Sequence, residues 1–136
     1  MTMTYIPVYL VSVVVFFCID MLWLGYVAPS FYKSHIGHLM SDTVRWPVAI
    51  VFYLLFLVGL LLFVLIPALE GRGLSYALIY GALFGFFTYM TYDMTNWATL
   101  RDWPMLLSLV DMMWGTLLSL TVSGVTYWIS TTYILN

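Results

Sequence analysis

The sequence predicts an all-α membrane protein: a bundle of four transmembrane helices, with a short interfacial helix in the first connection. Of the 136 residues, 64% are hydrophobic and only 7% are charged, whereas soluble domains carry about 25% charged residues. The mean hydropathy is +1.02. Four apolar stretches each reach the roughly 20 residues that a spanning helix needs. We expect residues 1–136 to form a single domain.

The four predicted helices cover residues 5–27, 46–69, 75–98 and 104–129. Pro47 and Pro104 stand in first turns, where proline is tolerated, and Gly71 and Gly73 follow the second helix. The second and third connections are short, so the last three helices should be antiparallel neighbours. The long first connection, "APSFYKSHIGHLMSDTVR", has apolar residues at helical spacing, which predicts a short amphipathic helix in the interface.

The few cations suggest an orientation. Lys33, Arg45 and Arg101 lie in the first and third connections, whereas Arg72 lies in the second. The positive-inside rule then places the first and third connections in the cytoplasm and both termini outside it. The formal net charge of −2 argues against nucleic acid as a partner.

Three aspartates lie inside the apolar runs, in "CIDMLWLG", "YDMTNW" and "LVDMMWG". With a rise of 1.5 Å per residue, Asp20, Asp93 and Asp111 lie about 6–10 Å from the helix middles, all on one side of the midplane. An ionised Asp facing lipid costs about 2.5–3.5 kcal/mol or more. We therefore expect the three acids to converge inside the bundle, and they are the candidate catalytic residues.

Small and polar residues on the third and fourth helices recur at helical spacing, and they predict the faces on which these helices pack. The two stripes are Gly81, Gly85, Tyr89, Asp93 and Asn96, and Ser108, Asp111, Gly115, Ser119 and Ser123. The neighbouring aromatic and polar residues are candidates for substrate binding: Tyr89, Tyr92, Asn96, Trp23, Trp97 and Trp114.

Close carboxylates in a low dielectric cannot all be ionised, so the cluster should titrate as a unit. That behaviour would suit proton transfer, cation binding or general acid–base chemistry. The competing interpretation is structural: each protonated Asp bonds a hydroxyl group and holds two helices together.

His35 and His38 are candidate metal ligands, because His-x-x-His on a helix can present two ligands on one face, and Asp residues could complete the set. The simpler interpretation is a pair of interfacial histidines beside lipid headgroups. The sequence contains no recognised cofactor motif.

The segments "IDMLWLG", "GALFGFFTYMTYDMTNWATLRDWP" and "DMMWGTLLS" together resemble a family of small bacterial inner-membrane proteins that is known only as a domain of unknown function. The resemblance covers nearly the whole chain and implies a location in the bacterial inner membrane. It favours a lipid as the substrate class and implies no catalytic role for any residue.

Three functions follow from these observations. The first is an intramembrane site near the cytoplasmic leaflet that binds or processes a membrane lipid or small amphiphile. The second is a proton- or cation-coupled small transporter, which would need a homodimer or larger assembly because four helices make a thin wall. The third is an accessory membrane subunit without catalytic activity. The sequence leaves open whether the protein is an enzyme.

Overall fold

The computed structural model describes residues 5–135, and these residues are helical apart from short connections. Residues 1–4 and 136, the ends of the predicted domain, lie outside the described residues. The elements in chain order are α1 (Tyr5–Leu22), η1 (Trp23–Val27), α2 (Ala28–Ile36), η2 (Gly37–Leu39), α3 (Trp46–Leu60), η3 (Leu61–Leu65), η4 (Ala68–Arg72), α4 (Gly73–Thr99), α5 (Met105–Ile129) and η5 (Ser130–Ile134).

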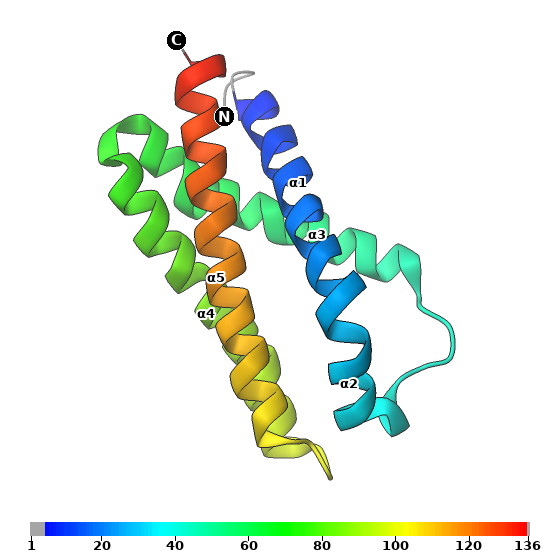
Figure 1. Ribbon diagram of the computed structural model, residues 1–136. Helices are drawn as coiled ribbons and strands as arrows, with labels where there is room; N and C mark the ends of the chain where they lie inside the picture. Colours follow the sequence, from blue (N-terminus) through cyan, green and yellow to red (C-terminus); the bar gives the residue numbers. More distant parts are fainter. Residues whose placement is uncertain (1–4, 136) are drawn as a thin grey trace.

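By length and composition, the described residues contain three helices able to cross a membrane, where the sequence predicted four. They are Tyr5–Leu39, Trp46–Thr99 and Met105–Ile134. The difference arises in the middle helix, because helical hydrogen bonding runs on through the second predicted connection. Glu70 (φ −84°, ψ 16°) and Gly71 (φ 123°, ψ −5°) leave the helical region inside it. A positive φ of this kind favours glycine, and the chain turns back at this point (Figure 1).

The first helix also differs from the prediction. The sequence predicted a separate interfacial helix after residue 27, but α2 continues α1 through the π-helical turn η1 and then η2, in one run of 35 residues. Pro29, which has no N–H to donate, lies just after this turn, where the Ala28 N–H bonds the Trp23 carbonyl five residues back. The wider π turn accommodates the break in the hydrogen-bond ladder that proline causes.

α4 and α5 run side by side along their length (Figure 1). Their contact is close because glycines of one helix face small residues of the other. A Cβ built at Gly85 would fall on the Gly115 carbonyl and the Ser119 side chain, and one built at Gly81 would meet Ser123. The two small-residue stripes are therefore the packed faces, as the sequence predicted. We call this contact the α4–α5 seam.

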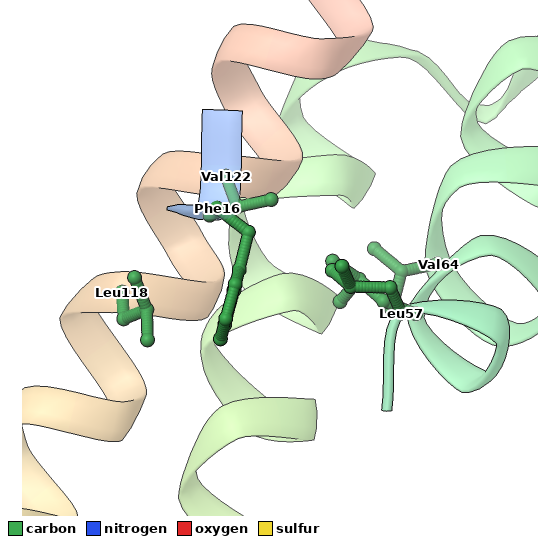
Figure 2. Close-up of a cluster of buried hydrophobic side chains, with 6 residues drawn as sticks. Phe16, Leu57, Val64, Leu118 and Val122 are labelled. Carbon is green, nitrogen blue, oxygen red and sulfur yellow. The ribbon is translucent and has the colours of Figure 1, made fainter. Parts of the chain in front are cut away.

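A hydrophobic core lies where α1, α3 with η3, and α5 meet. Figure 2 shows Phe16 of α1 between Leu118 and Val122 of α5 on one side and Leu57 and Val64 on the other. These side chains are almost completely buried. The first three turns of α3, by contrast, bury no residue fully, so this half of α3 stands apart from the core.

Candidate functional site

A pocket of about 990 Å³ lies between the first half of α3 and the other helices. This volume is at the upper end of the range for small-molecule sites. Three of its wall residues on α3, Val48, Phe52 and Leu55, are 53–67% exposed, so the pocket opens at the lipid-facing surface of the bundle. The pocket is lined by Asp20, Trp23, Leu24, Tyr32, Arg45, Val48, Ala49, Phe52, Tyr53, Leu55, Phe56, Phe84, Thr88, Tyr89, Tyr92, Asp111 and Trp114.

Asp20, from the last turn of α1, lies in the pocket wall and is only 4% exposed. The Tyr53 hydroxyl of α3 and the Trp114 indole of α5 interact with its carboxylate as hydrogen-bond donors. Three helices therefore meet at this one acid.

Asp111, on α5, is the second acid in the pocket wall and is 6% exposed. The Tyr32 hydroxyl of α2 donates a hydrogen bond to its Oδ1 across 79 residues of sequence. The Trp23 indole in turn interacts with the Tyr32 oxygen. This contact depends on the continuation of α1 into α2, which places Tyr32 in the pocket lining.

Asp93, on α4, is completely buried and stands behind Asp111 without lining the pocket. Among residues 5–135, its carboxyl oxygens have no hydrogen-bond partner. The Asp93 carboxyl group interacts with the nearby carboxyl group of Asp111. A lone ionised carboxylate at this depth would be very costly, and Asp111 is the acid that lies beside it.

Aromatic rings complete the walls around the acids. The Trp23 and Trp114 rings stack with centroids 4.4 Å apart and planes 8° apart. Tyr89 interacts electrostatically with all three acids and lies against the Gly115 backbone, where a Cβ would fall on its ring. Phe56 packs against Tyr89 and Phe84, with centroids 6.3 and 5.2 Å away. The pocket walls therefore combine packed aromatic rings with two carboxyl groups.

The structure brings most of the predicted site residues together. Asp20, Asp111, Trp23, Trp114, Tyr89 and Tyr92 line the pocket, with Asp93 directly behind. Asn96 and Trp97 do not line it. Asn96 interacts with Tyr92 one turn earlier in α4, and Trp97 is 38% exposed.

The structure does not gather His35 and His38 with the carboxylates. α2 ends at Ile36, which adopts φ −130° and ψ 20°, so the two histidines no longer share a helical face. His35 Nδ1 lies 2.8 Å from the Phe31 carbonyl oxygen. Across residues 5–135, no group of three or more His, Cys, Asp or Glu side chains is placed to hold a metal ion.

Sequence reasoning missed four polar residues of the pocket: Tyr32, Arg45, Tyr53 and Thr88. Tyr53 carries the one hydroxyl group in the apolar stretch 46–69, and that isolated polarity is a signal that could have identified it. Tyr32 offered no such signal, because its position in the long first connection suggested a membrane-surface helix.

A family described as "Predicted membrane protein (DUF2177)" matches residues 5–128 of the chain. The chain belongs to this family. Its function is unknown, which agrees with the resemblance seen in the sequence motifs. Comparisons with curated proteins and with solved structures gave no match. The three long apolar helices and the family membership together identify an integral membrane protein.

Proposed function

We propose that the pocket binds a membrane lipid or another small amphiphile beside the acids Asp20 and Asp111. The observation that carries this proposal is a large, mainly apolar pocket with two carboxyl groups in its wall. A few convergent polar groups in an apolar cavity are typical of small-molecule sites. Since the exposed half of α3 forms one wall, a ligand could enter sideways from the bilayer.

The acids suit proton transfer. Asp111 is in the pocket, while Asp93 is buried behind it and interacts with it. Asp111 would therefore be the group that gives a proton to the ligand or takes one, and Asp93 would exchange a proton with it. General acid–base chemistry requires a titrating group within hydrogen-bond reach of the reacting atom, and a ligand in this pocket could meet that condition.

Transport is the second candidate. Four hydroxyl groups of α5 and η5 continue from Asp111 toward the far end of the bundle and are buried without a partner among residues 5–135: Ser119, Ser123, Thr126 and Ser130. Such a line favours an ion or proton path. However, Ser119 and Ser123 pack against Gly85 and Gly81 with no room for an added Cβ, and neither lines the pocket. Ligand binding is therefore the better supported function, and a subunit role ranks third.

We also propose four membrane crossings in the bacterial inner membrane, with both chain ends outside the cytoplasm. The helical run Trp46–Thr99 has 54 residues, or roughly 80 Å at 1.5 Å per residue. That length is more than twice the roughly 30 Å hydrocarbon core. The turn at Gly71 would divide it into two spans, and the cations at residues 33, 45 and 101 would face the cytoplasm.

Photo-cross-linking with a phosphatidylethanolamine that carries a diazirine in its acyl chain tests the binding proposal. The purified protein in bilayer nanodiscs should be labelled at Tyr89 and Trp114, which line the pocket. Ala49→Phe fills the pocket and should remove this labelling. Val51→Phe, a matched change on α3 outside the pocket, should leave it unchanged.

Labelling confined to lipid-facing residues of the wild-type protein would contradict the proposal. Asp111→Asn separates binding from chemistry, because it keeps the shape of the side chain. This variant should retain the labelling at Tyr89. Cells that carry it should have the same lipid composition as cells in which the gene is deleted. If Asp20→Asn, Asp93→Asn and Asp111→Asn all behave like wild type there, the acids have no chemical role.

A further inference from the structure

Arg45 is the one cationic side chain in the pocket lining. It directly precedes α3 and is exposed. Within residues 5–135 its guanidinium group forms no ion pair, although Asp20 and Asp111 line the same pocket. The positive charge at this end of the pocket is therefore available to a ligand.

One face of α3 leads from this charge into the pocket. Arg45, Val48, Ala49, Phe52 and Phe56 all line it, at the three- and four-residue spacing of neighbours on a helix. From residue 45 to residue 56 the helix rises roughly 16 Å. The lining thus begins with a cation and continues with apolar side chains, which is the order of groups in a lipid with an anionic headgroup.

The acids lie at the other end of this face. Asp20 interacts with Tyr53, which is eight residues, or roughly 12 Å of helix rise, beyond Arg45. A headgroup beside Arg45 would therefore be separated from the carboxyl groups, and they would not repel it strongly.

We propose that Arg45 binds the phosphate of an anionic membrane phospholipid whose acyl chain lies along α3 in the pocket. This inference rests on the proposed function and adds the substrate class. Guanidinium groups bind phosphate through paired, charge-assisted hydrogen bonds, and they keep their charge in an apolar setting. The acyl chain would cover Val48, Ala49 and Phe52.

Arg101 provides a matched control. It lies in the connection between α4 and α5 and is also exposed, but it does not line the pocket. A general attraction between cations and anionic headgroups would act on both arginines. A specific phosphate site would depend on Arg45 alone.

The test repeats the photo-cross-linking in nanodiscs with equal amounts of phosphatidylglycerol and phosphatidylcholine. Two samples are compared, one with the diazirine on phosphatidylglycerol and one with it on phosphatidylcholine. In wild type, labelling at Tyr89 and Trp114 should favour phosphatidylglycerol. Arg45→Gln should lower that preference roughly tenfold or more, the loss expected when a hydrogen bond to a charged group is removed. Arg45→Lys should keep part of it, and Arg101→Gln should keep all of it.

Equal labelling by both lipids in wild type, or an unchanged preference in Arg45→Gln, would overturn this inference alone. In either case Tyr89 and Trp114 would still be labelled, so the pocket would remain a lipid site. No labelling of these two residues by either lipid would overturn both proposals. An equal loss of preference in Arg101→Gln would show general attraction and contradict the site at Arg45.

Discussion

The two sides of α5 differ in how closely the neighbouring helices approach, and this difference sets the surroundings of the polar residues on each side. Toward α4, glycines and serines bring the helices so close that a Cβ at Gly81 or Gly85 would collide with the neighbouring helix. Toward α1 and α3, large rings hold the helices apart, and a pocket of about 990 Å³ remains. Small residues permit close backbone contact in lipid, while stacked rings at Trp23 and Trp114 act as spacers.

This difference decides what the buried polar groups can do. The Ser119 and Ser123 hydroxyl groups lie in the α4–α5 seam without partners among residues 5–135, but a ligand has no room there. Asp20 and Asp111 are almost as buried, yet both line open space. Space beside a polar group, more than its burial, therefore separates a candidate site from a packing interface.

A bulky residue in the seam should have the greatest effect on stability. Gly85→Leu would drive its side chain into the Gly115 backbone, so we expect a loss of about 3 kcal/mol or more and little folded protein. Gly25→Leu is the control, because a Cβ at Gly25 meets no atom within 4 Å. Fluorescence-detected size exclusion after heating would compare them. Equal stability of the two variants would show that the seam is not closely packed.

A hydrogen bond across the seam should have an intermediate effect. The Ser108 hydroxyl donates to the Asp93 carbonyl at 2.9 Å and accepts from the Trp103 indole N–H at 2.8 Å. Ser108→Ala leaves that buried indole without an acceptor, so the expected loss is about 1–3 kcal/mol.

Thr116→Ala is the control for Ser108→Ala, since among residues 5–135 the Thr116 hydroxyl bonds only the Met112 carbonyl of its own helix. This substitution should cost clearly less stability. Denaturation in mixed micelles measures both variants. A smaller loss for Ser108→Ala than for Thr116→Ala would contradict a role for Ser108 in joining α4 to the start of α5.

Removal of an unpartnered hydroxyl should have the smallest effect. Ser123 is completely buried, and its hydroxyl has no hydrogen-bond partner in the described part of the chain. Ser123→Ala should therefore change the stability by no more than about 0.5 kcal/mol in either direction, because no bond is lost. A proton flux into liposomes that the wild-type protein supports and Ser123→Ala abolishes would instead favour the transport alternative.

Much of the fold could be read from local pattern. The apolar runs located the starts of α1, α3, α4 and α5 to within two residues, although not the ends of the first two runs. The spacing of Gly81, Gly85, Ser119 and Ser123 identified the packed faces of α4 and α5. Both patterns are properties of single helices in a bilayer, which penalises exposed backbone and isolated charge. The convergence of Asp20, Asp93 and Asp111 followed from the same penalty.

Tertiary structure decided the shape of the site. The sequence placed three acids at one depth, but only packing put Asp20 and Asp111 in the pocket wall and Asp93 behind them. The continuation of α1 into α2, which brings Tyr32 to Asp111, depends on how one π-helical turn accommodates Pro29. Local periodicity describes one helix at a time, whereas a pocket is the space left between several helices.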